Sequence, residues 1–495
     1  MDRPVEVVDA RAALAPAISL VCAALVFASA DNTFWRRFFS IAAALAKLVI
    51  VMSMLPGSLR GVVYTFKLVE FTEGVGLAFR ADALGMFFSV VSSTLWLITT
   101  IYAIGYMERE PNRRRFFGFF ALCVSTTVGV AFAENLLTMF LFYESLTICT
   151  YPLVIHDETP EAMKAGRKYL IYTLTGGAFV LLGSIVTYQL AGTMTLSQPG
   201  ILPLEAGRTT LTMLFVALIA GFGVKAAIMP LHGWLPSAMV APTPVSALLH
   251  AVAVVKVGAF GILRTIYNIF GVALLRELGV CTWLAALAAF TILAASVVAI
   301  FQDNLKRRLA FSTISQLSYI VLGAALLTPL AATAAIVHIA NQAFAKITMF
   351  FVAGSIQRTT GKTTVHELAG IGFRMPYTMA AFTVAALSFI GVPLFAGFVT
   401  KWYLSLGALE AGEWWYALVM LASALLNAAY WLPVVYTAFF KTEPTAEVEV
   451  HEAHWTMLGP TLVCAVFVII LGATVSVPGM PFALASAAVK FVFGM

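Results

Sequence analysis

Seven ionisable residues of this chain stand inside long apolar stretches. They are Glu144, Lys225, His250, Lys256, His338, Lys346 and Lys401. Charged groups inside a membrane are costly, so they usually mark an ion pathway or pair with one another. Burial disfavours the charged form of a lysine, and a nearby carboxylate restores it. A glutamate that approaches or leaves a buried lysine can therefore load or release a proton, and this chemistry needs no metal ion.

The spacing of the second group of residues indicates a proton wire. His338 and Lys346 are eight residues apart, which is about 12 Å along a helix axis and about 80° around it. Asn341 and Gln342 lie between them, so lysine, histidine and amide groups bridged by water could carry a proton. His250 and Lys256 do not share a face of a straight helix. Either that helix is distorted or the two side chains meet different partners.

Structural interpretations compete with this one. A lysine near a helix end can reach the membrane surface with its long side chain, which weakens the case for Lys346 and Lys401. Glu144, Lys225 and Lys256 have apolar residues on both sides, so that explanation suits them poorly. Lys47 also lies within an apolar run, and the sequence assigns it no role.

No metal or cofactor site is predicted. His451 and His454 could bind a metal ion, but two histidines in an acidic loop are more simply a solvated surface. The five cysteines form no C-x-x-C motif, and no nucleotide-binding loop or nucleic-acid motif is visible.

The composition excludes a soluble enzyme. Of 495 residues, 61% are hydrophobic and 11% are charged, against about 45–50% and about 25% in soluble domains. A membrane-spanning helix uses about 20 apolar residues. The sequence therefore predicts an all-α polytopic membrane protein of about fourteen transmembrane helices. These are expected at 12–29, 36–55, 82–106, 115–133, 135–155, 167–191, 210–230, 243–264, 279–301, 308–328, 332–356, 376–400, 414–439 and 456–477.

Both ends of the chain carry further signals. The first run ends in small residues, Phe27 to Ala30, as a signal-peptide cleavage site does, but the segment before it mixes Asp2, Glu6 and Asp9 with its arginines. A retained helix is favoured. The stretch from Pro478 to Met495 is too short for another span and could lie along the membrane surface.

Basic residues orient the chain. More of the loop Lys and Arg follow odd-numbered helices than even-numbered ones, and the richest loops are Glu108–Arg115 and Lys306–Arg308. Because cytoplasmic loops are enriched in Lys and Arg, both termini are expected on the outer, periplasmic side of the cell (inner) membrane.

An internal repeat is predicted from two matches. Ala220–Lys225 and Ala396–Lys401 both read A-G-F-x-x-K, 176 residues apart, and a pattern that includes Lys168 recurs around Lys346 at an offset of 178. These offsets pair helix 7 with helix 12 and helix 6 with helix 11. Five helices separate the copies, an odd number, so the copies cross the membrane in opposite directions, which is typical of transporters.

Prolines and the repeat together set the expected boundaries. Pro230 and Pro393 predict that helices 7 and 12 are broken. The expected organisation is 1–114 for helices 1–3, 115–265 and 279–440 for the inverted repeats (helices 4–8 and 9–13), and 441–495 for the C-terminal loop and helix 14.

Four stretches resemble a known family. They are Phe142–Tyr151, Gly223–Val257, Asn304–Tyr319 and Gly391–Trp402. The chain is similar to the proton-translocating, antiporter-like subunits shared by respiratory complex I, membrane-bound hydrogenases and Mrp sodium/proton antiporters. The resemblance implies fourteen helices, with helices 4–8 and 9–13 as inverted repeats and helices 7 and 12 broken, and no redox cofactor in the subunit.

The resemblance also implies roles for the seven residues. Glu144 would pair with Lys225. His250 and Lys256 would form a central relay, which His338 and Lys346 would continue. Lys401 would be the terminal group toward the outer side. Some complex I subunits carry glutamate at this last position, and the largest has a long lateral helix that this chain lacks.

Four functions follow as alternatives. The chain looks most like the D-type subunit of an Mrp-type Na⁺/H⁺ antiporter. It could instead be the pumping subunit of a complex I-like NADH:quinone oxidoreductase or a membrane-bound hydrogenase, a non-conducting scaffold, or a self-sufficient transporter of a small solute. The first two imply other integral membrane subunits as partners, with protons as the transported ion. The sequence leaves open whether Na⁺ crosses this chain and whether the complex is an enzyme.

Overall fold

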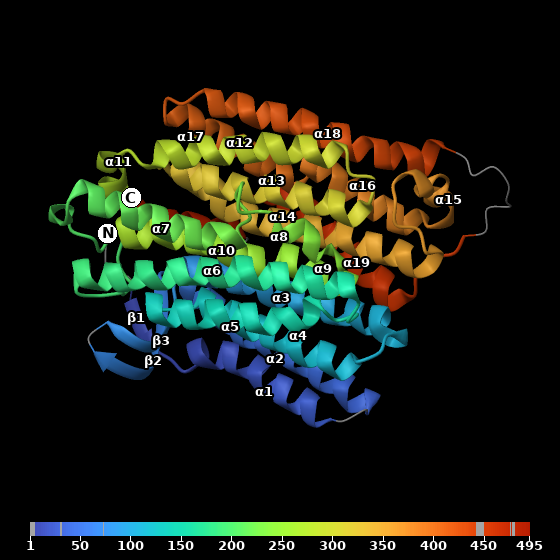
Figure 1. The fold of residues 1–495 in the computed structure, drawn as a ribbon, viewed down its shortest axis with the longest axis horizontal. Coiled ribbons are helices and arrows are strands. Elements are labelled where there is room, and N and C mark those ends of the chain that lie inside the picture. Colours follow the sequence, from blue (N-terminus) through green and yellow to red (C-terminus); the bar gives the residue numbers. More distant parts are fainter. Residues whose placement is uncertain (1–4, 30–31, 73, 442–449, 476, 478–480) are drawn as a thin grey trace.

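The computed structural model describes residues 5–29, 32–72, 74–441, 450–475, 477 and 481–495. Long helices lie side by side, and a small sheet stands at one end of the bundle, near the C-terminus (Figure 1). Ala30, which ends the small-residue motif, and Asp2 lie outside the described residues.

The helices of the first half follow one another closely along the chain. They are α1 (Arg11–Ala28), α2 (Thr33–Ser58), α3 (Ala83–Tyr106), α4 (Arg113–Ala131), α5 (Leu136–Val154), α6 (Pro160–Ala191), α7 (Arg208–Lys225), α8 (Trp234–Ser237), α9 (Thr243–Ala251) and α10 (Val254–Arg264). Those of the second half are α11 (Val272–Leu278), α12 (Cys281–Ile300), α13 (Leu305–Ala325), α14 (Pro329–Thr360), α15 (Ile371–Arg374), α16 (Pro376–Ile390), α17 (Ala396–Glu410), α18 (Trp415–Phe440), α19 (Trp455–Ala473) and α20 (Pro481–Phe493).

The all-α, multi-pass membrane architecture is confirmed. In the described part of the chain, twelve helices are long and apolar enough to cross a membrane by length and composition. These twelve correspond to twelve of the predicted spans. The other two predicted spans coincide with α13, which carries Ser312, Thr313, Ser315 and Gln316, and with the pair α16 and α17.

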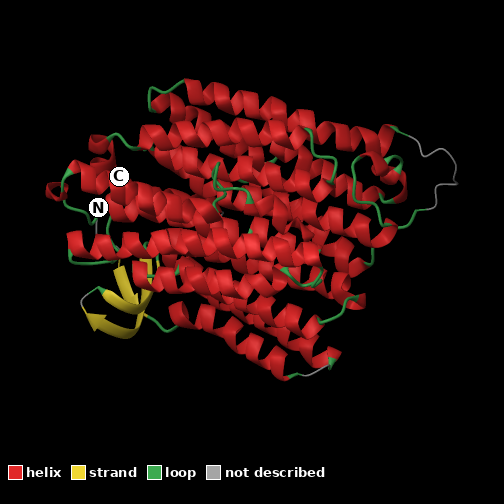
Figure 2. Ribbon diagram, in the orientation of Figure 1, coloured by secondary structure: helices red, strands yellow, loops and turns green. Residues whose placement is uncertain are grey.

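A three-stranded sheet was not predicted (Figure 2). It consists of β1 (Val5–Val8), β2 (Val62–Thr72) and β3 (Val75–Ala81), with β1 parallel and β3 antiparallel to the central β2. Valine, threonine and aromatic residues favour strands, but polar residues interrupt them here, so this region contains no long apolar run. The backbone pairing of the strands is accompanied by an ion pair at 2.6 Å between Arg80 of β3 and Glu6 of β1.

Two 32-residue helices show the internal repeat directly. Both α6 and α14 begin with proline after a capping threonine, Thr159 or Thr328, and both end at a left-handed glycine. A glycine is favoured there because its φ is positive. The two threonines are 169 residues apart. The pairing of helix 6 with helix 11 therefore stands, but the predicted offsets of 176 and 178 are wrong.

The error in offset comes from the A-G-F-x-x-K match. The first copy, Ala220–Lys225, ends α7 before its break, whereas the second, Ala396–Lys401, begins α17 after a break. The two segments are not structurally equivalent. Alanine, glycine and phenylalanine are common in apolar helices, so a short match of these residues does not define a register.

Two equivalent β-bridges, one from each copy of the repeat, lie at opposite ends of the bundle. Asn135 bridges to Thr195 beside the sheet, where Phe79 of β3 also pairs with Ala133. Asn304 bridges to Thr364, again 169 residues on, in the loop that precedes α15 at the other end of the molecule (Figure 1). This opposite placement supports an inverted repeat.

Three interruptions divide the central helices. The first separates Lys225 from α8, and the second separates Ile390 from α17, as Pro230 and Pro393 predicted. Ala227 and Leu394 have positive φ at these points. The third lies between Ala251 and Val254, where α9 gives way to α10.

The C-terminal helix α20 packs against α3 and α14. Its residues Leu484, Ala485, Ala488 and Val489 are buried in these contacts. The sequence suggested a position along the membrane surface for this stretch, but it did not predict that α20 packs on the bundle.

Candidate functional site

Six of the seven predicted site residues are buried in the interior of the bundle. Lys225, His250, Lys256 and Lys346 are 0% exposed, His338 is 2% exposed and Lys401 is 9% exposed. Glu144 is partly exposed. The residues come from α5, α7, α9, α10, α14 and α17, so they meet only through the packing of distant segments.

Lys225 is the last residue of α7 and faces α5. Its Nζ donates a hydrogen bond to the backbone carbonyl of Tyr143 and lies 3.4 Å from the centre of the Tyr143 ring. The Tyr143 hydroxyl donates to the carbonyl of Gly221 at 3.0 Å, which ties the two helices together a second time. Tyr143 therefore positions Lys225, a role that was not predicted from the sequence.

Glu144 follows Tyr143 but forms no ion pair with Lys225 among the described residues. Its buried Oε1 has no hydrogen-bond partner there. The carboxylate lies against Gly177 of α6, where a Cβ atom would come within 2.0 Å of Oε1. The charges of Glu144 and Lys225 still interact electrostatically. Glu144 and Lys225 are thus electrostatically coupled but not in contact, and Lys225 donates its hydrogen bond to the Tyr143 carbonyl instead.

Gly258 of α10 allows this turn of α7 to pack closely. A Cβ atom at Gly258 would lie 2.3 Å from the backbone nitrogen of Ala226 and 2.8 Å from the Cβ of Lys225. Neither atom can move without shifting the end of α7. The absence of a side chain at Gly258 therefore determines how near α10 approaches Lys225.

We expect Gly258→Ala to lower stability by about 1–3 kcal/mol, the usual cost of overpacking a tight core. The measurement is the apparent unfolding temperature of the purified protein. Gly459→Ala on α19 is the matched control, because a Cβ atom there meets no neighbour within 4 Å. Equal unfolding temperatures for the two variants would contradict the close packing.

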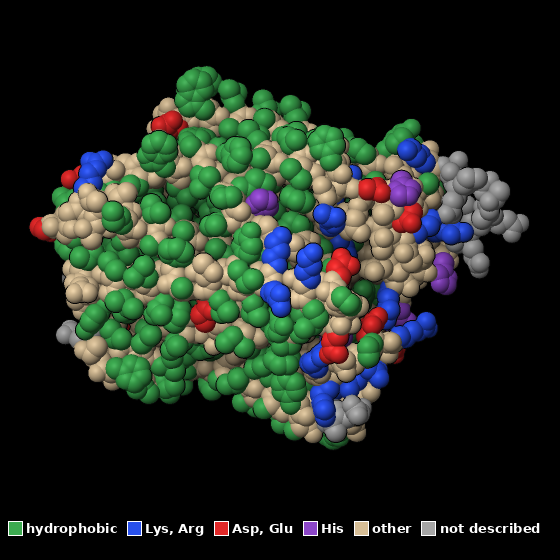
Figure 3. Space-filling model, viewed as in Figure 1, with side chains coloured by type: hydrophobic (Ala, Val, Ile, Leu, Met, Phe, Trp, Pro, Cys, Tyr) green, Lys and Arg blue, Asp and Glu red, His purple; other side chains and the backbone are tan. Residues whose placement is uncertain are grey.

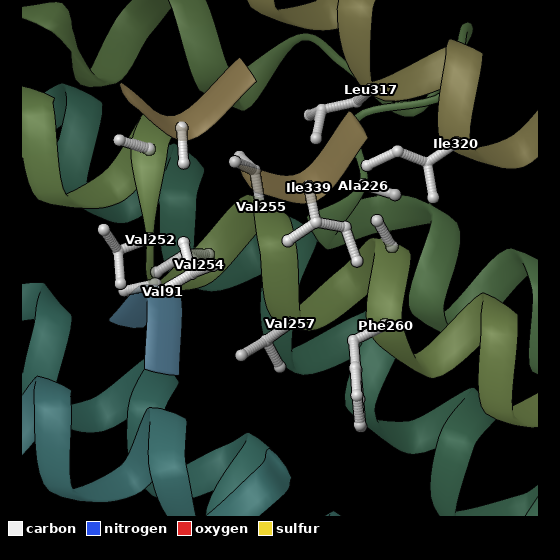
Figure 4. Packing of buried hydrophobic residues seen from close by; sticks show 14 of the residues in the cluster. Val91, Ala226, Val252, Val254, Val255, Val257, Phe260, Leu317, Ile320 and Ile339 are labelled. Carbon is white, nitrogen blue, oxygen red and sulfur yellow. The ribbon is translucent and has the colours of Figure 1, made fainter. Parts of the chain in front are cut away.

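His250 and Lys256 flank the third interruption. Neither ring nitrogen of His250 nor the Nζ of Lys256 has a hydrogen-bond partner among the described residues. The His250 ring packs on Phe350 with centres 4.9 Å apart. The distorted helix is thus confirmed. Figure 4 shows that Val252, Val254 and Val255, at the interruption itself, belong to a buried apolar cluster with side chains of other helices, among them Val91 and Ile339.

Lys256 is also electrostatically linked to α14. Lys256 lies within electrostatic range of His338 and Lys346, and Lys346 within that range of His250. Buried polar groups without protein partners generally hydrogen-bond to ordered water. This arrangement suits a wire in which water bridges lysine and histidine side chains.

His338 and Asn341 tie α14 to the start of α17. His338 Nδ1 lies 3.2 Å from the Oγ1 of Thr400, and its ring stacks on Tyr319 at 5.1 Å. The Asn341 amide donates to the carbonyl of Ala396 at 2.8 Å and to Thr400 at 3.0 Å. Thr400 precedes Lys401, so this contact connects the α14 residues with the segment that carries Lys401.

Lys401 is held at the second helix break. Its Nζ donates to the carbonyls of Phe389 and Ile390 at 2.8 and 2.9 Å, at the C-terminal end of α16. The partial negative charge at a helix C-terminus favours a cation. The side chain is therefore held inside the protein and does not extend to the membrane surface.

Lys346 is also held inside the protein. Its Nζ donates to the Ser312 hydroxyl at 2.8 Å and lies 4.3 Å from the centre of the Phe389 ring. Ser312 is hydrogen-bonded in turn to Tyr430 of α18, and Tyr430 to Asn427. Ser312, Asn427 and Tyr430 were not predicted from the sequence. The available signal was two polar side chains, Asn427 and Tyr430, three positions apart in an apolar span.

The remaining candidates have structural roles. Lys47 donates from Nζ to the carbonyl of Val124 at 3.2 Å and lies 4.7 Å from the Trp96 ring, so it joins α2 to α4. His454 caps α19 through Thr456. Within the described residues, no group of three or more His, Cys, Asp or Glu could hold a metal ion.

A family profile matches more than half of the chain. Its description is NADH:quinone oxidoreductase/Mrp antiporter, TM, and it covers residues 133–427. A second profile, the N-terminus of chain 5 of NADH-ubiquinone oxidoreductase (complex I), covers residues 72–117.

Individual proteins show the same similarity. The chain is 34% identical to NADH-quinone oxidoreductase subunit N of Desulforudis audaxviator, over 88% of this chain and 90% of the relative. It is 25% identical to the D-type subunit of a Na⁺/H⁺ antiporter of Bacillus subtilis, over 92% of each. Among solved structures, a chain of the membrane-bound sulfane sulfur reductase, an archaeal respiratory membrane complex, superposes with a TM-score of 0.86 at 25% identity over 97% of both chains.

Proposed function

Because this chain belongs to the family of membrane subunits that NADH:quinone oxidoreductases share with Mrp antiporters, we propose that it conducts protons as one subunit of a larger membrane complex. The observation that carries the proposal is the series of buried titratable side chains at the three helix interruptions. Proton pathways in membranes are built from such groups, and non-helical backbone at membrane depth is typical of ion sites.

The proposed path runs from Glu144 and Lys225 through the central pair, His250 and Lys256. It continues on α14 and reaches Lys401 at the second break. Tyr143 holds Lys225, and the buried oxygen of Glu144 has no hydrogen-bond partner among the described residues. Movement of the carboxylate toward the ammonium would therefore change the proton affinity of the lysine. In this order Lys401 is the terminal group toward the outer side.

The distribution of charge supports an orientation with both termini outside the cell membrane. On the face drawn in Figure 3, most of the visible Lys and Arg side chains lie on the half of the molecule away from the end where Figure 1 places the strands. The basic segments Glu108–Arg115 and Lys306–Arg308, which lead into α4 and begin α13, belong to this half, because Glu110 pairs with Arg358 at the end of α14 and Asn304 bridges to Thr364 before α15. Under the positive-inside rule this half faces the cytoplasm, and the sheet and α20 face outward.

Two kinds of complex are candidates. An Mrp-type antiporter is supported by the similarity to the Bacillus subtilis antiporter chain over nearly the full length of both proteins. A redox-driven complex is supported by the higher identity to subunit N of an NADH-quinone oxidoreductase. In either case the partners are other integral membrane subunits, and energy reaches this chain from them.

The test uses the intact complex in inverted membrane vesicles. We would measure the Na⁺-induced collapse of a respiration-generated ΔpH in wild type and in Lys225→Ala. A Na⁺-dependent collapse that the variant lacks indicates an Mrp-type antiporter whose proton path includes this chain. Proton pumping that depends on an electron donor, and that the variant lacks, indicates the redox-driven complex. Normal proton movement in the variant would refute the proposal.

A further inference from the structure

Two buried lysines on different helices are joined by a continuous series of hydrogen bonds. Lys346 donates from Nζ to the Oγ of Ser312 on α13 at 2.8 Å. The hydroxyl of Tyr430 on α18 lies 3.1 Å from the same oxygen and is also bonded to the Oδ1 of Asn427. Ser312, Asn427 and Tyr430 are each 0% exposed.

The series reaches Lys401 through a backbone carbonyl. Asn427 donates from Nδ2 to the carbonyl oxygen of Phe389 at 2.8 Å. The same oxygen accepts the hydrogen bond from Lys401 at 2.8 Å. Phe389 is the second-last residue of α16, directly before the helix break. The Phe389 carbonyl at the break thus accepts hydrogen bonds from both the Asn427 amide and the Lys401 ammonium.

The direction of these hydrogen bonds depends on the proton of Lys346. A charged lysine only donates, and each hydroxyl has one proton to give. With Lys346 charged, Ser312 accepts from it, and the single proton of the Tyr430 hydroxyl goes to the Oδ1 of Asn427. A neutral Lys346 can accept from Ser312. Tyr430 then donates to Ser312 instead and gives up its bond to Asn427.

We propose that Ser312, Tyr430 and Asn427 form a coupling bridge through which the protonation state of Lys346 alters the hold on Lys401. When Tyr430 turns away, the Asn427 amide is freed, and its bond to the Phe389 carbonyl weakens. Lys401 is then the main donor to the Phe389 carbonyl, and its hydrogen bond to that oxygen becomes stronger. No proton crosses Asn427, so these three are positioning residues. This inference rests on the proposed function.

Other titratable groups face Lys346 and enter the pH dependence of any measurement. They are Lys256 on α10, His250 on α9, His338 on α14 itself and Tyr430 on α18. Tyr430→Phe removes one of these four titratable groups, whereas Ser312→Ala removes none of them. Ser312→Ala therefore tests the hydrogen bonds of the bridge without a direct change in titration.

The test measures proton flux in inverted vesicles that contain the complete complex, across a range of pH. In Tyr430→Phe we expect a flux at least about tenfold lower, the scale of one lost hydrogen bond in a charge-bearing network, and a shift in the pH of half-maximal flux. Tyr436→Phe is the matched control, because Tyr436 lies on the same helix and is 55% exposed.

A double variant separates a bridge from independent contacts. If Ser312 and Tyr430 act in one series, Ser312→Ala with Tyr430→Phe loses no more flux than either change alone. Wild-type flux and an unchanged pH profile in Tyr430→Phe would overturn the inference, and so would additive losses in the double variant. If Tyr430→Phe does not assemble, Ser312→Ala carries the same expectation.

Lys346→Met in the same series distinguishes the two proposals. If Lys346→Met abolishes flux while Tyr430→Phe and Ser312→Ala behave as wild type, the bridge is wrong and the proposed function stands. If Lys346→Met itself conducts normally, the proposed function fails, and the bridge fails with it.

Discussion

Lys225→Met and Glu144→Gln are each expected to reduce proton translocation about a hundredfold or more, which is the scale of losing one acid–base group from a proton-transfer step. Lys225 is fully buried, and its Nζ donates to the Tyr143 carbonyl. A methionine preserves the apolar packing but cannot bind a proton. Glutamine keeps the shape of Glu144 but removes the charge that acts on the lysine.

The same variants separate conduction from a scaffold role. A scaffold whose charges only hold helices together predicts a lower yield of complex, with unchanged activity in what survives. Conduction predicts normal yield without proton movement. Glu205→Gln is the control for Glu144→Gln, since Glu205 is exposed in the short turn before α7. Normal pumping in both Glu144→Gln and Lys225→Met would exclude a proton path through these residues.

Arg264→Met is expected to destabilise the protein by about 3–5 kcal/mol, because it leaves a buried carboxylate without its partner. Arg264 donates from Nη1 and Nη2 to the two oxygens of Asp82 at 2.6 and 2.8 Å. The side chains are 3% and 15% exposed. Asp82 also caps α3 through the backbone nitrogen of Gly85. The pair therefore joins α10 to the start of α3.

The apparent unfolding temperature of the purified complex measures this loss. Asp82→Asn combined with Arg264→Met should recover part of it, since no charge is then left unpaired. Glu108→Gln is the control: its partner Arg37 and Glu108 itself are 39% and 59% exposed, and such pairs contribute about 1 kcal/mol or less. Equal unfolding temperatures for Arg264→Met and Glu108→Gln would contradict the buried pair.

The pH dependence of stability follows from the same residues. Burial raises the pKa of Asp82, but the Arg264 guanidinium, the hydrogen bond from the Gly85 backbone and the charge of Arg80 together outweigh burial, so the pKa lies below its ordinary value. The resulting stability is present above the ordinary pKa of an aspartate and is lost as the pH falls through the lowered value. The Asp82→Asn, Arg264→Met double variant should lack this loss in acid.

The membrane class and most of the helices could be predicted because they depend on composition. Lipid excludes unpaired backbone groups, so any long apolar run becomes a helix. The breaks near Pro230 and Pro393 were also predictable, since proline cannot continue a helix. The interruption between α9 and α10 falls at Val252 and Ala253 and contains no proline or glycine. Only the mismatch of His250 and Lys256 pointed to it.

The short sheet and the repeat register could not be predicted in the same way. The strands contain too few apolar residues to appear as spans, and their pairing joins Val5–Val8 to a segment that begins at Val62. The register of the repeat is visible at capping residues such as Thr159 and Thr328, which are polar and lie outside the apolar runs.

The sequence by itself indicated six of the buried titratable groups, because a charge within an apolar run has little access to water. Only the tertiary structure decided which of these groups meet. Glu144 lies beside Gly177 and not on Lys225, and Lys346 reaches Lys401 through residues of three other helices. Burial follows from local composition, whereas contacts between Ser312, Phe389 and Tyr430 depend on how helices distant in the chain pack together.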